Sequence, residues 1–314
     1  MIMEEWIDMK GINDIIVIGA GTAGLTCAIY GLRAGKRVLV FEEKMYGGQI
    51  VNTPSVENYP GYKNISGFEF ANNLYEQAKT LGMEYRNERV IEIKCDETKG
   101  DDIKTVITEN GEYEARAVVI ATGAKNRMLG LEREEELTGK GVSYCATCDG
   151  AFFKGRDVAV VGGGNTALED ALFLSNYCSK VYVIHRRDEF RGDKSDVDKL
   201  GTKENVELVL NSTVEELLGE NKLEGIRVRN AADDKLTELK VAGVFIAVGQ
   251  MPDNERFRSI VELDEKGYIV AGEDCRTGAD GIFAAGDCRT KSVRQLVTAA
   301  GDGAVAGLGA SSVQ

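Results

Sequence analysis

The sequence lacks several features on which large classes of protein depend. It holds one histidine, His185, so a Ser-His-Asp triad is not expected and His185 is the only imidazole available as an acid or base. No run of 18 apolar residues is present, and we therefore predict no membrane-spanning segment and no membrane partner. The formal net charge of −13 argues against a nucleic-acid partner.

The chain has few cysteines, and their spacing does not suggest a secreted disulfide framework. There are seven in 314 residues, and apart from one pair they are scattered. The five single ones are expected to be small buried hydrophobic residues: Cys27, Cys95, Cys178, Cys275 and Cys288. The first eight residues are acidic where a signal peptide would be basic, so we predict no export and a cytoplasmic location.

The remaining two cysteines, Cys145 and Cys148, have C-x-x-C spacing. Such a pair indicates either a redox dithiol or half of a zinc site. Zinc needs four nitrogen or sulfur ligands, and the sequence has no second C-x-x-C and only one histidine, so we predict no metal. The pair lies shortly before a glycine-rich loop at Gly162. A redox disulfide beside a nucleotide site implies that electrons pass from a nucleotide to sulfur.

Two segments of the chain repeat each other at an offset of 143 residues. Residues 14–24 align with residues 157–167, and each segment is an apolar strand followed by G-x-G-x-x-G/A and a helical pattern. The glycines allow a tight turn and close backbone approach, so that a pyrophosphate can rest on the helix N-terminus. Two such copies strongly predict two dinucleotide-binding domains.

The two copies differ at the end of the next strand. Glu42 and His185 occupy equivalent positions there, where the adenosine ribose is met. Glu42 can accept a hydrogen bond from a free 2′-hydroxyl, as in FAD or NAD. The second copy has arginines instead, at 186, 187 and 191, which suit a 2′-phosphate and predict NADP(H). The alternative is that these arginines form a solvated surface run.

Both halves continue in the same way, with three short β-rich segments and a final apolar strand. We predict a meander of residues 90–94, 104–108 and 112–116 before a strand at 117–123 in the first half. In the second half we predict a meander of residues 206–210, 225–229 and 235–240. The fold class is therefore α/β, with two Rossmann-like domains, each a parallel sheet with helices and a three-stranded β-meander. The residues alone leave open which sheet the strand at 281–287 joins.

At this point the chain resembles a known family, the low-molecular-weight, bacterial-type thioredoxin reductases, over nearly its whole length. These FAD enzymes pass electrons from NADPH to the disulfide of thioredoxin. The matching motifs are Gly19-Ala-Gly-Thr-Ala-Gly24, Gly47-Gly-Gln49, Val56-Glu-Asn58, Cys145-Ala-Thr-Cys-Asp149, Gly162-Gly-Gly-Asn-Thr-Ala167, His185-Arg-Arg-Asp-Glu-Phe-Arg191, Ala284-Ala-Gly-Asp287 and Arg294-Gln295.

The resemblance implies domain boundaries, site residues and an assembly. An FAD domain would comprise residues 1–122 and 251–314, and an NADPH domain would comprise residues 123–250. FAD contacts are expected at Gly19, Gly21, Thr22, Ala23, Gly24, Glu42, Glu43, Gly47, Gly48, Gln49, Asn58, Val90, Thr122, Gly123, Gly286, Asp287, Arg294, Gln295 and Leu296. NADPH contacts are expected at Gly162, Gly164, Asn165, Thr166, Ala167, His185, Arg186, Arg187 and Arg191. A homodimer is implied by the resemblance alone.

The resemblance also implies a division of labour in the dithiol. Cys148 would take the flavin's electrons, Cys145 would attack thioredoxin, and Asp149 would act as acid and base. The alternative for Asp149 is an N-cap on the segment that follows. The NADPH site and the disulfide would lie in the same domain, and both must reach the flavin. A rotation of that domain between the two half-reactions is therefore expected.

Other functions remain as competing interpretations. A ferredoxin-fed reductase or an oxygen-reducing disulfide oxidase is disfavoured by the intact second loop and its arginines. The reductase partner of a peroxiredoxin would need an additional thioredoxin-like domain, and only about a dozen residues precede the first strand here. A non-catalytic nucleotide sensor would not need the pair Cys145–Cys148.

Overall fold

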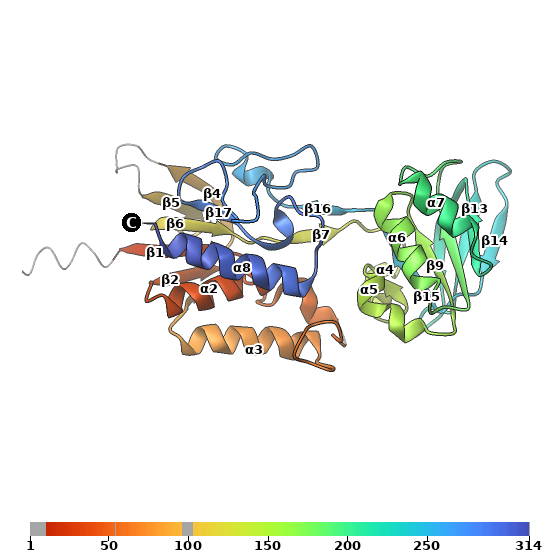
Figure 1. The fold of residues 1–314 in the computed structure, drawn as a ribbon, viewed down its shortest axis with the longest axis horizontal. Helices are drawn as coiled ribbons and strands as arrows, with labels where there is room; N and C mark the ends of the chain where they lie inside the picture. Colours follow the sequence, from red (N-terminus) through yellow and green to blue (C-terminus); the bar gives the residue numbers. More distant parts are fainter. Residues whose placement is uncertain (1–10, 54, 96–102, 314) are drawn as a thin grey trace, which may run out of the picture. The chain divides into compact units, whose positions relative to one another are not determined.

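A computed structural model of the chain describes residues 11–53, 55–95 and 103–313 (Figure 1). The acidic start from which we predicted no export lies outside the described residues. The chain divides into two compact units, residues 1–125 with 251–314, and residues 126–250. The first crossing between them therefore follows Lys125, a little after the predicted boundary at residue 122. Each unit is described by itself.

The first unit is built on one large sheet. Within the described residues its order is β3-β2-β1-β6-β5-β4, with β17 paired to β6. β1, β2, β3, β6 and β17 pair in parallel, whereas β4, β5 and the start of β6 form an antiparallel meander. The strands are β1 (Ile12–Ile18), β2 (Val38–Phe41), β3 (Glu84–Arg86), β4 (Val90–Cys95), β5 (Lys104–Thr108), β6 (Glu112–Ile120) and β17 (Ile282–Ala284).

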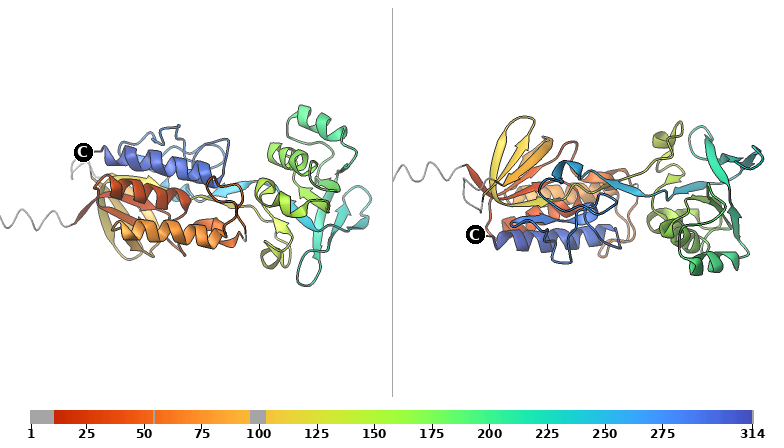
Figure 2. Two further views of the ribbon diagram at one scale, coloured as in Figure 1. Left: turned by 60° about the horizontal axis from the view of Figure 1, so that its bottom comes forward. Right: turned by 90° about the horizontal axis from the view of Figure 1, so that it is seen from above.

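Helices cover the parallel part of this sheet. Figure 2 shows α2 (Thr22–Arg33) and α8 (Leu296–Ser311) side by side, with α3 (Gly67–Thr80) beside α2. Residues 257–271 pack on the opposite face of the sheet. Because the parallel strands are covered on both faces, β2 and the end of β6 are continuous apolar runs that are buried throughout. Short 3₁₀ turns complete the unit: η1 (Gly48–Asn52), η4 (Glu255–Phe257) and η5 (Gly286–Cys288).

The structure corrects the predicted end of the first half. Residues 112–116 and 117–123 were expected to be two strands, but β6 runs without a break from Glu112 to Ile120. The strand changes partners along its length, because its first half pairs with β5 and its second half with β17. The strand at 281–287, which the residues alone left unassigned, thus lies in the first sheet.

The second unit has a five-stranded parallel sheet of order β11-β10-β9-β15-β8 within the described residues, and a separate antiparallel sheet β12-β13-β14. The strands are β8 (Val142–Ser143), β9 (Asp157–Val161), β10 (Lys180–Ile184), β11 (Val206–Val209), β12 (Ser212–Leu218), β13 (Gly225–Asn230), β14 (Leu236–Leu239) and β15 (Gly243–Ile246). The helices are α4 (Glu134–Leu137), α5 (Ala146–Asp149), α6 (Asn165–Leu174), α7 (Lys194–Gly201) and the 3₁₀ turn η3 (Gly150–Phe153).

The predicted meander of the second unit was wrong in its first strand. Residues 206–209 form β11, which pairs in parallel with β10, and the first meander strand is β12. Asn211 separates the two strands with a positive φ of 51°, a conformation that asparagine tolerates better than most residues. Sequence reasoning treated residues 206–210 as the meander strand and missed this turn.

The two crossings are carried by β7 (Ala124–Asn126) and β16 (Gln250–Pro252), which pair with each other. Four of the five single cysteines are buried, as predicted, but Cys95 at the end of β4 is exposed, so its predicted burial was wrong. None of the helices in the described residues is both long and apolar enough to cross a membrane.

Candidate functional site

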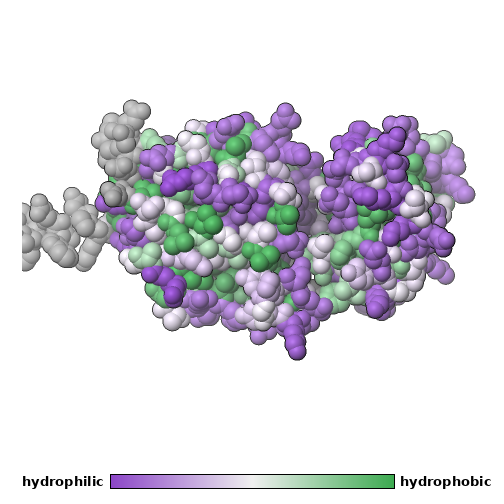
Figure 3. Space-filling model, viewed as in Figure 1, coloured by the Kyte–Doolittle hydropathy of each residue, from purple (hydrophilic) through white to green (hydrophobic). Residues whose placement is uncertain are grey.

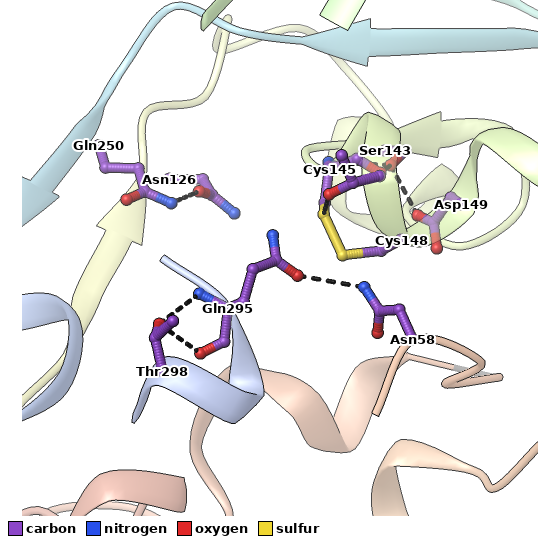
Figure 4. Close-up of a disulfide and its surroundings, with 10 residues drawn as sticks. Asn58, Asn126, Ser143, Cys145, Cys148, Asp149, Gln250, Gln295 and Thr298 are labelled. Atoms are coloured by element: carbon purple, nitrogen blue, oxygen red, sulfur yellow. Dashed lines mark hydrogen bonds between the residues drawn. A yellow bond between two sulfur atoms is a disulfide. The ribbon is translucent and has the colours of Figure 1, made fainter. Parts of the chain in front are cut away.

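Cys145 and Cys148 form a disulfide in the second unit, with a Cα–Cα distance of 5.3 Å (Figure 4). Cys145 is the N-cap residue of the one-turn helix α5, and Cys148 lies within that turn. Both residues are half-buried, so one side of the pair is open to solvent. Over the described residues, no group of three or more His, Cys, Asp or Glu side chains is placed to hold a metal ion.

Asp149 ends α5 and is bound by a residue that sequence reasoning missed. The hydroxyl of Ser143 donates to Asp149 Oδ2 at 2.6 Å. Asp149 stands at the N-cap position of η3, but its side chain makes no capping hydrogen bond there and binds Ser143 instead. Burial raises the pKa of Asp149, and the hydrogen bond from Ser143 lowers it in part. A carboxyl group whose neutral form is favoured is suited to holding a proton beside the disulfide.

A second carboxylate, Glu134, fixes the segment that leads to the disulfide. It is 1% exposed and accepts hydrogen bonds from the backbone N–H groups of residues 129, 130 and 131. It also accepts a hydrogen bond of 2.8 Å from the hydroxyl of Tyr144, the residue before Cys145. These four donors hold the carboxyl group in place, so Glu134 anchors this loop.

The second glycine loop has the geometry that an anion-binding helix start requires. Gly162 follows β9, and a Cβ there would lie 2.5 Å from the carbonyl oxygen of Ala247. Gly164 is the N-cap of α6, makes no side-chain cap, and has open space where its Cβ would be. Within the described residues no side chain caps the start of α6, as a pyrophosphate site needs. Asn165 holds the next loop by bonding to Asp193.

His185 lies beside this loop but is more enclosed than expected. It is 5% exposed, stacks on Phe190 at 5.2 Å, and occupies the space where a Cβ on Gly163 would be. Burial lowers the pKa of His185, and the charges of the neighbouring arginines 191, 187 and 186 lower it further. The His185 ring is therefore uncharged at pH 7 and packs against the loop at Gly163.

Arg186, Arg187 and Arg191 are all exposed and make no ion pair with any residue that the structure describes. The backbone N–H of Arg191 donates to Gly163 O at 2.7 Å, which fixes this basic segment against the glycine loop. A free cluster of guanidinium groups at this place suits a phosphate.

The first glycine loop is more tightly packed. Gly19 has a φ of 106°, and a Cβ there would lie 2.4 Å from Ala121 O. A Cβ on Gly24 would lie only 1.8 Å from Gly19 O, so α2 approaches the loop closely. Gly21 is the N-cap of α2 and makes no side-chain cap. The N-terminus of α2, with Thr22 and Ala23, is the counterpart of the α6 start.

Glu42 and Glu43 are adjacent but have different surroundings. The Glu42 carboxylate accepts from the backbone N–H groups of Ala20, at 2.8 Å, and Lys44, at 3.1 Å. A carboxylate has about four acceptor positions, so two remain for a ribose. Glu43 instead pairs with Arg256 at 3.5 Å and Arg89 at 3.6 Å. The structure thus gives Glu43 a structural partner where the sequence suggested a cofactor contact.

Asp287 lies in η5 of the first unit. Its Oδ1 atom is buried and has no hydrogen-bond partner among the described residues. Burial raises the pKa of Asp287, while the nearby charges of Lys291 and Arg294 lower it. A buried acceptor without a donor is costly, so this position calls for a ligand hydroxyl.

A buried ion cluster that sequence reasoning missed supports the turn before Asp287. Asp302 on α8 accepts from Gly286 N at 2.9 Å, twice from Arg289 at 2.8 Å, and from Lys291 at 2.9 Å. Burial raises the pKa of Asp302, but the bonds from Arg289 and Lys291 outweigh it and leave that pKa below its usual range. The signal in the sequence was an aspartate in a helix otherwise rich in alanine and glycine.

The remaining predicted residues of the first unit form its turns. Gly47 and Gly48 both have positive φ, and Gly47 N donates to Ala20 O at 2.7 Å. Gln49 Nε2 donates to Ala124 O, and Asn58 donates to Gln295 Oε1 at 3.1 Å (Figure 4). Arg294 lies over the ring of Tyr268 at 4.2 Å. Leu296 begins α8, Val90 begins β4, and Gly123 lies between β6 and β7.

Thr122 is bound by Asn254, another residue that the sequence did not single out. Thr122 Oγ1 donates to Asn254 Oδ1 at 3.1 Å, and Asn254 donates to the carbonyl oxygens of Gly267 and Cys288. Asn254 is 1% exposed and thus ties the end of β6 to η5 within the first unit.

The comparisons with known proteins agree with this geometry. The model of the pyridine nucleotide-disulphide oxidoreductase family matches residues 13–303. A thioredoxin reductase of Listeria innocua is 46% identical over 297 residues, which cover 94% of this chain and 92% of that protein. This chain belongs to the thioredoxin reductases of that family.

Two solved structures of the family are also similar. The thioredoxin reductase of Streptococcus pyogenes matches with a TM-score of 0.90 and 41% identity, covering 96% of this chain and 97% of that one. The Lactococcus lactis enzyme in its FR conformation matches with a TM-score of 0.65 and 38% identity, covering 95% and 97%.

The residues present fit the nucleotides that the family name implies. Each unit of this family member has an uncapped helix start behind a glycine loop, which suits a pyrophosphate. The first unit adds a half-satisfied carboxylate at Glu42 and the unpartnered buried acceptor of Asp287. The second adds three exposed arginines. These donor and acceptor sets are complementary to a dinucleotide with free hydroxyls and to one with an additional phosphate, respectively.

Proposed function

We propose that this chain is an NADPH-dependent thioredoxin-disulfide reductase that carries FAD. The observation that carries the proposal is the Cys145–Cys148 disulfide, which lies in a unit that also has a glycine loop with three exposed arginines. Electrons would pass from NADPH through FAD to this disulfide and then to thioredoxin or a thioredoxin-like protein.

The first unit would hold FAD. Gly19, Gly21 and Gly24 would receive its pyrophosphate, Glu42 a ribose hydroxyl, and Asp287 a hydroxyl of the ribityl chain. FAD, when bound, accepts a hydride equivalent and can reduce a disulfide by two electrons. The chain's own contribution is to hold the hydroxyls: Asp287 Oδ1 is already buried as an acceptor and lacks a donor in the described residues.

The second unit would bind NADPH as substrate. The start of α6 would receive the pyrophosphate, and Arg186, Arg187 and Arg191 the 2′-phosphate. His185, neutral and buried against Gly163, would shape the ribose pocket without adding charge. This arrangement favours NADPH over NADH.

The two cysteines would have different roles in thiol exchange. Once the disulfide is reduced, the Cys145 thiolate would attack the thioredoxin disulfide, breaking it and forming a mixed disulfide. Cys148 would then attack Cys145, restoring the Cys145–Cys148 bond and releasing thioredoxin with two electrons and two protons. Asp149, whose pKa burial raises, would supply and take back the proton at the adjacent sulfur.

A rotation between the units would complete the cycle. The NADPH site and the disulfide are both on the second unit, while the flavin site is on the first, so both must reach one ring in turn. The paired strands β7 and β16 are the two crossings about which such a motion would occur.

We also propose a homodimer in the cytoplasm. The outer face of α8 exposes Val297, Val305 and Leu308 by 41–55%, and Tyr30 on the adjacent α2 is 40% exposed. Figure 3 shows hydrophobic residues gathered over this face of the first unit. Burying such side chains favours association. A dithiol that must return to its reduced form in each cycle is suited to a reducing compartment.

The dithiol variants test the proposed chemistry. Cys145→Ser and Cys148→Ser should each abolish thioredoxin reduction, because a two-electron exchange needs both sulfurs. Both should still show bleaching of the flavin absorbance when NADPH is added without oxygen. Protein that has no yellow chromophore and cannot take up FAD would end the flavin part of the proposal.

Trapping then distinguishes the two sulfurs. With a thioredoxin that lacks its resolving cysteine, Cys148→Ser should accumulate a mixed disulfide through Cys145, and Cys145→Ser should not. The reverse pattern on a non-reducing gel would show that the two cysteines have exchanged roles.

A further inference from the structure

Ser143 contacts both Asp149 and the backbone of the redox motif. It ends β8 and is 4% exposed. Its Oγ donates to Asp149 Oδ2 at 2.6 Å, accepts from Cys145 N at 3.1 Å, and lies 3.4 Å from Cys145 O. Figure 4 shows Ser143 between Cys145 and Asp149.

These three contacts satisfy the hydroxyl in either protonation state of Asp149. A hydroxyl has one donor and two acceptor positions. When Asp149 is ionised, Ser143 gives its hydrogen to the carboxylate and accepts from Cys145 N. When Asp149 is protonated, the acid O–H can donate to Ser143 Oγ, which keeps Cys145 N as its other donor. The serine hydrogen then turns to Cys145 O.

We propose that Ser143 is a positioning residue that allows Asp149 to take up and release a proton while every nearby polar group stays hydrogen-bonded. The inference rests on the proposed acid–base role of Asp149. Its physical basis is that a buried donor or acceptor left unpaired is costly, so a site without such a rotor would favour one protonation state strongly. Asp149 would carry the proton, and Ser143 would respond by rotation of its hydroxyl.

Other titratable groups lie near Asp149, and a pH measurement must distinguish their titration from that of Asp149. Helix α6 packs against α5 and carries two carboxylates, Glu169 and Asp170. Burial, with Glu169 nearby, raises the pKa of Asp170 to about 7. On α5 itself, the two cysteines become titratable when the disulfide is reduced, and η3 adds no ionisable side chain.

The experiment is a pH profile of thioredoxin reduction by the full-length FAD-loaded enzyme, with Ser143→Ala and Ser143→Thr as variants. Ser143→Ala removes a hydrogen bond to the charged form of Asp149. The limb of the pH profile that reports the titration of Asp149 should therefore move to higher pH by about one pH unit. Ser143→Thr keeps a hydroxyl and should restore the wild-type position. A carboxyl-carbon NMR titration of Asp149 in the oxidised protein should show the same upward shift, independently of turnover.

Three further variants make the result decisive. Asp149→Asn identifies the limb by removing it, and Asp170→Asn should leave that limb in place. Ser175→Ala is the matched control, because Ser175 is 8% exposed, lies in the same unit, and its hydroxyl donates to the backbone oxygen of Leu172. It should cause no shift.

The outcomes separate the inference from the proposed function. If Asp149→Asn removes the limb and Ser143→Ala leaves it at the wild-type pH, the role of Ser143 is wrong and the proposed function stands. If Asp149→Asn leaves the profile unchanged, the acid–base role of Asp149 fails, and the inference fails with it. An equal shift in Ser175→Ala, or no recovery in Ser143→Thr, would also overturn the inference.

Discussion

The two glycine loops of this chain have the same strand–loop–helix structure, but their glycines stand at different positions. In the first loop Ala20 has a side chain, and its N–H donates to Glu42. In the second loop the matching residue is Gly163, because the ring of His185 lies 2.1 Å from where a Cβ would be. Four positions further along, the first loop has Gly24, whose Cβ would meet Gly19 O at 1.8 Å, and the second has Ala167.

The difference shows that the loop and the end of the next strand are one unit of recognition. A carboxylate at position 42 binds the loop through a backbone N–H and tolerates an alanine there. The imidazole of His185 fills the space beside the second loop, so the loop residue next to it, Gly163, can have no side chain. The charge that follows then decides the ligand: a carboxylate suits a free ribose, and arginines suit a phosphate.

The largest expected effect comes from making the first loop resemble the second. Gly24→Ala places a methyl group against Gly19 O, which should cost roughly 1–3 kcal/mol in stability and abolish FAD retention. The measurement is the ratio of flavin to protein after purification. The reverse change, Ala167→Gly, should cost only about 0.5–1 kcal/mol, because it merely adds a glycine to a helix, and should leave FAD bound. Equal flavin loss in both variants would contradict the comparison.

The next effect concerns the charge that distinguishes the loops. Arg186→Ala with Arg187→Ala should raise the KM for NADPH roughly tenfold to a hundredfold, because charge-assisted phosphate contacts are lost. Use of NADH should be nearly unchanged, since NADH has no 2′-phosphate. Steady-state kinetics with both nucleotides is the measurement, and an equal loss with both would show that the arginines do not read the phosphate.

The smallest expected effect concerns the helices that follow the two loops, α2 and α6. Asp170 on α6 matches Cys27 on α2, and burial raises the pKa of Asp170 from 3.8 to about 7. Between these values the folded state binds more protons than the unfolded chain, so stability falls as pH rises through this window. Asp170→Asn should therefore raise Tm by about a few degrees above pH 7 and leave it unchanged near pH 4. A Tm difference that is constant with pH would contradict this assignment.

The sequence predicted the strand–loop–helix units because they are local. The turn at Gly19 or Gly162 and the helix start behind it depend on neighbouring residues, and their spacing is visible in the sequence. The meander was predicted less well, since Val206–Val209 and Ser212–Leu218 have similar β-rich composition and only pairing tells them apart. The ion pair between Glu43 and Arg256 joins residues more than 200 positions apart, and no local pattern in the sequence indicates it.

The sequence by itself determined the chemistry that is available: a spaced dithiol, two glycine loops, and opposite charges behind them. The tertiary structure alone decided which polar groups meet inside the units. Asp302 meets Arg289, Lys291 and Gly286 N only because α8 packs where η5 turns. Asp149 bonds Ser143 rather than the following helix only because β8 ends beside α5. The reason is that a buried polar side chain must find its partner in space, and no local pattern in the sequence records that choice.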